Sequence, residues 1–181
     1  MKKEVQIGSI LISKPFIEDK RFEKTIILIA EHNKNGTVGF IINQPTNLTI
    51  DELLPDLKDF SINIKKGGPV ETNNLFFIHK YPDLIHNSIE IKNGFFWGGE
   101  LQDIVKGYQN KEITNDQISF FLGYTGWEKN QLEEEINEGS WIISEINLTK
   151  FNEKINWSTL LIAINKEYEV WATAPADFHL N

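Results

Sequence analysis

The chain contains no cysteine, a single arginine and no long hydrophobic run. The absence of cysteine excludes disulfides, thiolate nucleophiles and cysteine-ligated metals together. Arginine makes the bidentate contacts by which proteins hold phosphate and guanine, and Arg21 is the only one among 18 basic residues. The longest aliphatic runs, at 26–30 and 160–164, have five residues each, whereas a membrane-spanning helix needs about 20. No apolar signal-peptide segment follows Lys2 and Lys3, so we expect a cytoplasmic protein with no membrane partner.

The charge of the chain is acidic and unevenly distributed. Its 26 acidic and 18 basic residues give a formal net charge of -8. Residues 1–43 carry seven bases and five acids, whereas residues 100–141 carry nine acids and three bases. An acidic chain with almost no arginine interacts poorly with a phosphate backbone, so we do not expect direct nucleic-acid binding.

Size and composition predict one ordinary globular domain. The chain has 181 residues, of which 40% are hydrophobic, and this is enough for a sizeable core. The twelve Phe and five Trp residues are an ample aromatic supply, and core packing is the simplest role for most of them. Because no linker, repeat or low-complexity tract divides the chain, we expect residues 1–181 to form a single domain.

Hydrophobic patterning predicts strands mixed with a few helices. Turn sequences at 33–36 and 93–94 each join two apolar segments into a hairpin. Thr49 and Glu52 form a capping box, which predicts a short helix ending near Pro55. The predicted strands are 5–13, 25–31, 38–42, 75–79, 88–91, 95–97, 118–124, 141–146 and 168–172. The longer predicted helices are 101–110 and 157–164. We also predict a loop at 16–24, a tight link at 67–70 and a turn or short helix at 147–152. Hairpins mixed with helices are typical of an α+β (mixed α/β) fold rather than a doubly wound parallel sheet.

Residues 118–141 allow two interpretations. In the first they form a strand, a Gly-Tyr-Thr-Gly-Trp turn, a short helix and a strand, with Leu132 and Ile136 as an apolar stripe and Gly139 as a left-handed C-terminal cap. In the second they form a helix-turn-helix, whose recognition helix at 128–138 carries five glutamates and one lysine. Such a helix repels phosphates, so we favour the first interpretation.

No catalytic or cofactor-binding motif is present. The glycine pairs at 67–68 and 98–99 lack the spacing of a phosphate loop, and no serine lies in a Gly-x-Ser-x-Gly turn. The four histidines lack the spacing of a helical zinc motif, although His32 and His79 end predicted strands and could meet in space. Glu133-Glu134-Glu135 is most simply a solvated helix face. We therefore expect no metal and no cofactor, and no residue is identified as catalytic.

Several sequence blocks, in one order, resemble the YqgE/AlgH family of bacterial proteins. The resemblance runs from residue 8 to residue 181 and is carried by Gly8-Ser9-Ile10-Leu11-Ile12, Asp19-x-x-Phe22-x-x-Thr25 continuing to Glu31-His32, Gly39-Phe40-Ile41-Ile42-Asn43-Gln44-Pro45, Gly67-Gly68-Pro69-Val70, Phe121-Leu122-Gly123-Tyr124-Thr125-Gly126-Trp127, Gln131-Leu132-Glu133-x-Glu135-Ile136, Gly139-x-Trp141 and Leu180-Asn181. Ordered blocks together are far more specific than any one of them. One departure is Gln44, where family members usually have arginine, and this puts in doubt a role for that position toward an anionic ligand.

The resemblance implies a fold and a regulatory context. Family members are similar to single-domain proteins whose mostly antiparallel sheet curls into a partial barrel with flanking helices. Their function is largely unknown, and a transcriptional-regulator label comes from one member linked to alginate production. That label implies regulation without implying a DNA-binding site, and the acidic charge of this chain argues against one.

We therefore expect a non-enzymatic cytoplasmic protein that acts through a protein or small-molecule partner, in an interaction or regulatory role. The candidate partner-binding residues lie in glycine- and aromatic-rich blocks near loop ends: Asn43, Pro45, Gly68, Pro69, Tyr124 and Trp127. Trp127 could equally be a core anchor, in which case its truncation would cost about 3–5 kcal/mol. Two alternatives stay open: a transcriptional regulator acting directly on DNA, and a hydrolase built on His32 or His79 with a nearby carboxylate.

Overall fold

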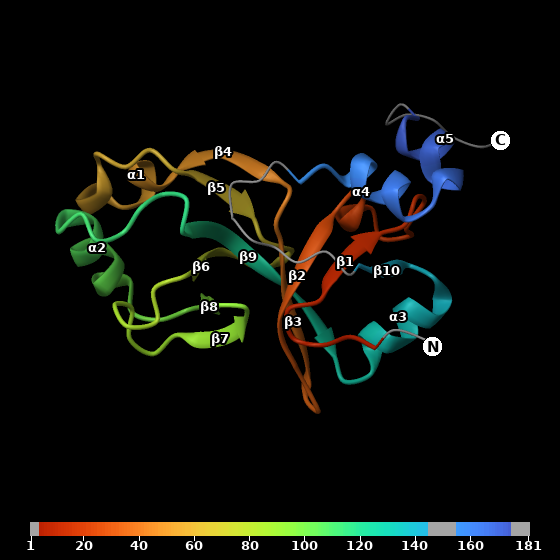
Figure 1. Ribbon diagram of the computed structural model, residues 1–181, viewed down its shortest axis with the longest axis horizontal. Helices are drawn as coiled ribbons and strands as arrows, with labels where there is room; N and C mark the ends of the chain where they lie inside the picture. The colour runs from red at the N-terminus through yellow and green to blue at the C-terminus, as the bar shows by residue number, and fades with distance from the viewer. Residues whose placement is uncertain (1–3, 145–154, 175–181) are drawn as a thin grey trace.

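The structure, a computed structural model, describes residues 4–144 and 155–174. Within these ranges ten strands form one large sheet that curls without closing, and five α-helices lie around it (Figure 1). The expected α+β fold with a curled, mostly antiparallel sheet is therefore confirmed. No helix in the described part of the chain is long and apolar enough to cross a membrane.

The strands follow the spatial order β10-β1-β2-β3-β9-β6-β8-β7, with antiparallel neighbours throughout. Off this path, β5 lies parallel to β9, and β4 pairs with β5. The bounds of the strands are β1 (Ile10–Ser13), β2 (Ile26–Asn33), β3 (Gly36–Ile41), β4 (Pro45–Thr49), β5 (Asn63–Lys66), β6 (Val70–His79), β7 (Ile89–Lys92), β8 (Phe95–Trp97), β9 (Ile118–Glu128) and β10 (Trp141–Ser144). The helices are α1 (Ile50–Leu53), α2 (Leu101–Gln109), α3 (Gln131–Glu138), α4 (Trp157–Ile164) and α5 (Glu169–Ala172), with short 3-10 turns at Lys20–Phe22, Pro55–Leu57 and Lys166–Tyr168.

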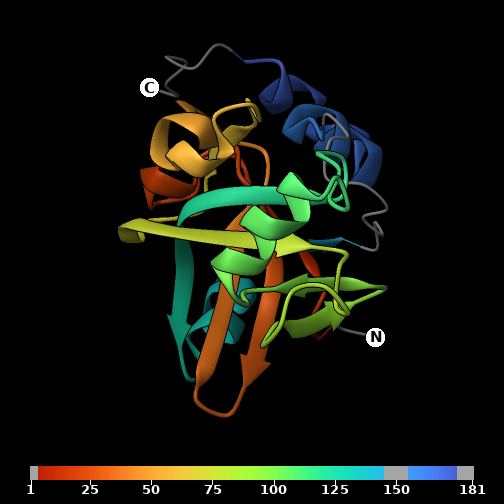
Figure 2. The ribbon, with the colours of Figure 1, turned by 90° about the vertical axis from the view of Figure 1, so that its left-hand side faces the viewer.

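The strand β9 joins the two halves of the sheet. Residues 125–128 pair with β3, whereas residues 118–124 pair with β6, and two of these also pair with β5. Gly123 lies where the partner strand changes, with φ of +70°, a conformation that favours glycine. Figure 2 shows β9 bending sharply between its two halves. This strand is the apolar segment that the favoured interpretation predicts, and the helix-turn-helix interpretation is wrong.

Three apolar clusters fill the core. One covers the inner face of the curled sheet under α4 and contains Phe40, Phe121 and Trp157. A second lies between the sheet and the helices α1 and α2, and a third lies beneath α3. Ile10 of β1 and Ile91 of β7 belong to the same cluster, although the two strands are far apart in the sheet order. The curl of the sheet therefore brings its two ends toward a common core.

The local signals that depend on turn and cap chemistry are confirmed. The hairpins β2–β3 and β7–β8 form across the predicted turns. The Glu52 carboxylate accepts the Thr49 N–H at 2.7 Å, as the capping box requires. Gly139 has φ of +90° at the end of α3. The predicted helices 101–110 and 157–164 correspond to α2 and α4, and the Asn156 side chain caps α4 by accepting the Thr159 N–H.

The predicted strand at 168–172 is wrong, because this segment is a 3-10 turn followed by α5. Tyr168 and Val170 would share one face of a strand, yet Tyr168 packs against the core while Val170 is 67% exposed. The exposure fits a helix, in which residues two apart point to opposite sides. Asn165 starts the turn by accepting the Glu167 N–H, a capping signal that the strand prediction overlooked.

Several predicted boundaries are also corrected. The first strand begins at Ile10 rather than Val5, and β6 begins at Val70, five residues earlier than predicted. The 118–124 strand continues to Glu128, and α3 accordingly starts at Gln131. The predicted turn or short helix at 147–152, and the last two residues of the predicted strand 141–146, lie outside the described residues.

Candidate functional site

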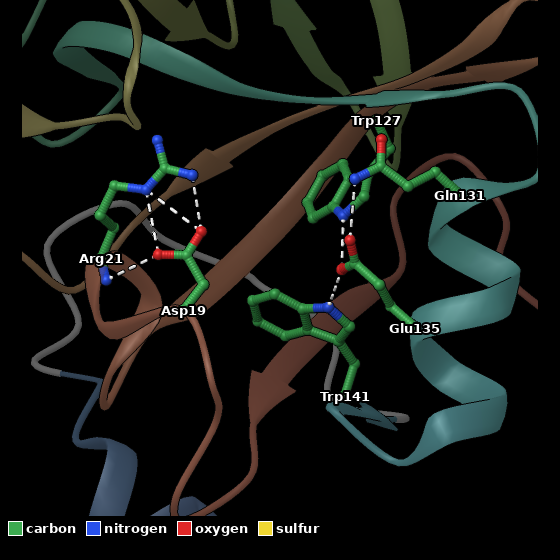
Figure 3. Close-up of polar contacts among 6 residues, drawn as sticks. All are labelled: Asp19, Arg21, Trp127, Gln131, Glu135 and Trp141. Atoms are coloured by element: carbon green, nitrogen blue, oxygen red, sulfur yellow. Dashed lines mark hydrogen bonds and ion pairs between the residues drawn. The ribbon is translucent and has the colours of Figure 1, made fainter.

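Two tryptophans and one glutamate form a half-buried polar cluster beneath α3 (Figure 3). Glu135 Oε2 accepts hydrogen bonds from Trp127 Nε1 at 2.9 Å and from Trp141 Nε1 at 2.7 Å. Glu135 Oε1 accepts one from Gln131 Nε2 at 2.9 Å, and Gln131 Oε1 accepts the Glu128 N–H at 2.9 Å. These bonds tie α3 to both β9 and β10. We call Trp127, Gln131, Glu135 and Trp141 the tryptophan cluster.

Aromatic packing surrounds the tryptophan cluster. The two indole rings meet edge to face at 6.0 Å, and Phe22 packs against both of them. Trp127 is 5% exposed, so this candidate residue lies in the core beneath α3 rather than on a surface. The prediction of a solvated face at Glu133-Glu134-Glu135 is wrong for Glu135, because its carboxylate turns inward to accept the two indole donors.

The single arginine lies near this cluster and is already paired with a carboxylate. Arg21 Nη2 lies 2.6 Å from Asp19 Oδ2, and Arg21 Nε donates to the same carboxylate (Figure 3). These hydrogen bonds lower the pKa of Asp19. The guanidinium is also 5.9 Å from the Phe22 ring. Arg21 thus stabilises the loop before β2, with its fork occupied by Asp19.

The other five candidates lie where the β3–β4 and β5–β6 links pass β9. We call residues 43–45, 65–69 and 121–124 the strand crossing. Backbone hydrogen bonds of 2.8 Å join its three segments, from Lys66 N–H to Gln44 O and from Gly67 N–H to Leu122 O. The sequence blocks of this region, which are distant along the chain, are therefore adjacent in space.

Glycine is required at the crossing because the backbones approach closely. A Cβ on Gly68 would lie 2.2 Å from the carbonyl carbon of Tyr124, and one on Gly67 would lie 2.1 Å from Gly123 O. Both contacts are with main-chain atoms, which cannot rotate away. The predicted tight link at 67–70 thus packs directly on β9.

Asn43 and the two prolines occupy different positions at the crossing. The Asn43 side chain accepts the Ile26 N–H at 2.8 Å and donates to Lys24 O at 2.9 Å, so it holds the start of β2. Pro45 is exposed and is paired with Lys65 across β4 and β5. Pro69 is half-buried. Asn43 has a structural role here, whereas Pro45 lies at the surface.

Lys65 is the charged group at the centre of the crossing. Its Nζ lies 5.8 Å from the centre of the Phe121 ring, whereas the next residue, Lys66, is exposed. Burial disfavours an ammonium ion and lowers the pKa of Lys65 to about 8. A lysine with such a pKa in an aromatic setting marks a candidate site.

Aromatic rings extend from Lys65 across the inner face of the sheet. Phe40 is their centre, with ring centroids 5.2 Å from Phe121, 5.7 Å from Trp97 and 5.9 Å from Phe76. Tyr124 meets Phe76 edge to face at 5.5 Å. Trp97 Nε1 is buried and meets no hydrogen-bond acceptor in the described part of the chain. We call Phe40, Phe76, Trp97, Phe121 and Tyr124 the aromatic face.

His79 is a core residue locked in one tautomer. It is fully buried, its Nε2 donates to Gly98 O at 3.1 Å, and its Nδ1 accepts the Tyr81 N–H at 3.1 Å. Burial lowers the pKa of His79, so the ring is neutral near pH 7. With both nitrogens bonded to the backbone, His79 has no atom left for acid-base chemistry.

His32 and His86 each have hydroxyl or carboxylate neighbours. His32 Nδ1 lies 2.8 Å from Thr37 Oγ1, and its Nε2 lies 3.5 Å from Glu133 Oε1. Thr37 faces His32 across the β2–β3 hairpin and is only 5% exposed, so no substrate reaches its hydroxyl. His86 Nδ1 lies 2.7 Å from Asp103 Oδ2, which joins a loop to α2. Over residues 4–144 and 155–174, no three His, Asp or Glu side chains form a group that could hold a metal ion.

A separate hollow lies at the C-terminal end of α3. It has a volume of about 240 Å³ and is lined by residues 14–18 and 138–140, including Glu18 and Glu138. A Cβ on Gly139 would lie 3.2 Å from Lys14 Nζ, so the ammonium rests at the negative end of the helix. The favourable interaction with the C-terminal end of α3 therefore accounts for the position of Lys14.

Sequence reasoning missed Lys65, Trp97 and Glu135. The alternation of Ile62 and Ile64 with polar residues predicts a strand at 61–66, and it places Lys65 on the face opposite to the isoleucines. That signal could have identified β5. No sequence signal shows that both faces of β5 are covered, because the covering residues come from distant segments.

Comparison with known proteins assigns the chain to a family. A family model described as AlgH-like matches residues 10–169. A protein of Cytophaga hutchinsonii, named UPF0301 protein, is 36% identical over 178 residues, which cover 96% of this chain and 98% of that protein. A Bacteroides fragilis protein of the same designation is 37% identical over 178 residues, which cover 96% of this chain and 90% of that protein. These names state no activity or ligand.

Solved structures share the fold. The solution structure of the AlgH protein from Pseudomonas aeruginosa is 25% identical, with a TM-score of 0.70, and the match covers 97% of this chain and 99% of that one. A crystal structure of a Corynebacterium diphtheriae protein matches with a TM-score of 0.75 at 19% identity, over 96% of this chain and 95% of that one. The chain belongs to the AlgH-like family.

Proposed function

We propose that this member of the AlgH-like family is a non-enzymatic cytoplasmic protein that binds a small molecule or a protein partner at the strand crossing. The observation that carries the proposal is the convergence of segments 43–45, 65–69 and 121–124 around Lys65. Glycines at this point bring the backbones of segments 65–69 and 121–124 into contact, and the charged side chain of Lys65 lies beside the Phe121 ring. A partly buried charge beside aromatic rings is typical of a ligand or partner site.

The arrangement of polar groups favours binding over catalysis. A hydrolase needs an accessible nucleophile within reach of a base. The hydroxyl beside His32 belongs to the buried Thr37, and both nitrogens of His79 are bonded to the backbone. The histidine alternatives from the sequence therefore receive no support from the geometry.

The charges around α3 also favour a partner other than DNA. Glu133, Glu134 and Glu138 are exposed on α3, and the guanidinium of Arg21 is paired with Asp19. Phosphate groups approaching this face would meet negative charge.

Substitution of an exposed proline tests the proposal without disturbing the core. Pro45→Glu adds a charge at the crossing, and Pro82→Glu makes the same change at another exposed proline. Wild-type protein purified from its native cells is analysed by native mass spectrometry and by affinity capture. We expect a small molecule or protein bound to the wild type and to Pro82→Glu but lost from Pro45→Glu. Wild-type protein that carries no partner, or a partner retained by Pro45→Glu at unchanged affinity, would overturn the proposal.

A further inference from the structure

The hollow at the C-terminal end of α3 lies between the loop after β1 and the corner where α3 turns into β10 (Figure 1). The Lys14 N–H donates to Ser140 O at 3.0 Å, so the two segments are joined. Gly139 ends α3 with a left-handed cap, and its N–H donates to Ile136 O at 3.1 Å. Ile17 is 7% exposed and anchors the loop in the core cluster beneath α3. The walls of the hollow are therefore preformed, as in most small-molecule sites.

The hollow has the size of a small metabolite and is open to solvent. Its volume of about 240 Å³ equals that of roughly eight water molecules, at about 30 Å³ each in the liquid. Three of the residues that line it, Phe16, Glu18 and Glu138, are exposed. A molecule the size of an amino acid can therefore enter from solvent and fill it.

Charges of both signs line the hollow. Lys14 supplies an ammonium at the negative end of α3, and Glu18 and Glu138 supply two carboxylates. Within residues 4–144 and 155–174, none of these three side chains forms an ion pair. A ligand with only a negative charge would meet the two carboxylates, and one with only a positive charge would meet Lys14. Like charges brought together disfavour binding, so the lining favours a ligand that carries both charges.

Phe16 places an aromatic ring at the hollow against the preference of its own backbone. It follows Pro15 in a turn and has φ of +63°, a conformation in which glycine is unstrained and a bulky residue is an outlier. Phe16 is 51% exposed, so core burial does not explain the strain. Its ring meets Trp171 of α5 edge to face at 4.8 Å, and this contact orients it. An oriented, half-exposed ring offers contact area to an apolar group.

We infer that the hollow binds a free amino acid with an apolar side chain. Its carboxylate meets Lys14, its ammonium meets the carboxylates of Glu18 and Glu138, and its side chain lies against Phe16. A free amino acid bears both charges on neighbouring atoms, whereas each end of a peptide bears only one of them. The hollow shares no residue with the strand crossing, so this is a second site, beyond the proposed function.

The test compares three molecules that have the same ring and differ in charge. L-phenylalanine carries both charges, 3-phenylpropionate lacks the ammonium, and 2-phenylethylamine lacks the carboxylate. Binding is followed by the backbone N–H signals of Gly139 and Ser140 in nitrogen-15 correlation spectra. We expect millimolar L-phenylalanine to shift these signals and to bind about tenfold or more tightly than either analogue, because each analogue loses a charge-assisted hydrogen bond and keeps a like-charge contact.

Matched variants locate the two charges. Lys14→Gln should weaken L-phenylalanine binding by about tenfold and leave 2-phenylethylamine no weaker, because that amine loses only a repulsion. Glu18→Gln should weaken L-phenylalanine and leave 3-phenylpropionate no weaker, for the same reason. Lys20→Gln and Glu134→Gln are the controls, since both residues are exposed outside the hollow, and neither should change any of the three affinities.

Phe16→Gly separates a ligand contact from a purely structural role. The positive φ suits glycine, so the variant should fold, as far-ultraviolet circular dichroism would show. Its affinity for L-phenylalanine should fall several-fold because the ring is gone. Unchanged affinity in the folded variant would mean that the ring only anchors α5 through Trp171, and the inference would be overturned.

The comparison on the wild type decides the ligand class even where a variant fails to fold. Equal binding of the three molecules, or no shift of Gly139 and Ser140 with L-phenylalanine, would overturn the inference. Equal effects of Lys14→Gln and Lys20→Gln would do the same. Because the two sites share no residue, these outcomes leave the Pro45→Glu capture experiment unaffected, and failure of that experiment leaves the hollow unaffected.

Discussion

Replacement of Glu135 by alanine should destabilise the protein by about 3 kcal/mol. In the folded protein the Glu135 carboxylate is the hydrogen-bond acceptor for both Trp127 Nε1 and Trp141 Nε1, whose residues are 5% and 3% exposed. Truncation leaves two buried indole donors without an acceptor, and each such donor costs about 1–3 kcal/mol. The loss of the Gln131 bond adds little, because Gln131 is exposed and keeps access to water.

The assay is equilibrium unfolding in urea, followed by far-ultraviolet circular dichroism. A loss of about 3 kcal/mol lowers the melting temperature of a chain of this size by roughly 6–12 °C, which thermal scans would detect independently. Glu134→Ala is the matched control, because Glu134 is the exposed neighbour on the same helix and its removal should change stability by less than about 0.5 kcal/mol.

A graded variant adds a second check. Glu135→Gln keeps one carbonyl acceptor for the indoles but replaces the other oxygen by an amide donor that faces Gln131. Its cost should therefore fall between those of Glu134→Ala and Glu135→Ala. The reasoning is refuted if Glu135→Ala is no more destabilising than Glu134→Ala, since the two indoles would then not depend on the carboxylate.

Three further predictions concern the glycine contact, an unpartnered hydroxyl and a buried imidazole. Gly68→Ala should abolish stable folding, because its Cβ would lie 2.2 Å from the carbonyl carbon of Tyr124. In contrast, a Cβ on Gly126, which lies on β9 like Tyr124, meets nothing closer than 3.3 Å, so Gly126→Ala should fold. Soluble yield and circular dichroism of the two variants would show the contrast. Tyr108→Phe should leave the free energy of unfolding in urea unchanged or raise it by up to about 1 kcal/mol, because the buried Tyr108 hydroxyl has no partner in the described residues. A clear destabilisation would show that this hydroxyl is hydrogen-bonded in solution. The pKa of His79 is lowered in the folded protein, so its ring is neutral there. As the pH falls below about 6.5, the unfolded chain binds a proton at His79 before the folded chain does, so the free energy of unfolding should stay constant above that pH and decrease below it. This decrease should be smaller in His79→Gln, and an equal dependence of the unfolding free energy on pH in variant and wild type would contradict the prediction.

Local chemistry predicted the parts of the fold that short segments determine by themselves. The turns at 33–36 and 93–94, the Thr49 cap and Gly139 are decided by φ preferences and by hydrogen bonds within a few residues, and these elements are confirmed. The strand at 168–172 failed because a five-residue apolar pattern fits both a strand and a short helix, and only packing against α4 separates them.

The candidate site depends more on distant contacts. Asn43, Pro45, Gly68 and Tyr124 were predicted from blocks near loop ends, and their segments do meet at the strand crossing. Lys65 was missed because the ring beside its ammonium, Phe121 on β9, is distant in the sequence. The role of Glu135 was missed for the same reason. A run of three glutamates predicts a solvated helix face, and only the indole N–H groups of Trp127 on β9 and Trp141 on β10 show that one of the three is a half-buried acceptor.

The segment from Phe121 to Trp141, which carries several of the family blocks, combines two separate roles. Residues 121–124 belong to the strand crossing, where Phe121 lies beneath Lys65. Residues from Trp127 onward hold α3 on the sheet through Trp127, Glu135 and Trp141. Gly123, with its positive φ, lies just before the point between Tyr124 and Thr125 where β9 changes partner strands. Because the two halves lie in different core clusters, substitutions in the tryptophan cluster should alter stability with little effect on affinity at the strand crossing, while Lys65→Gln should do the reverse.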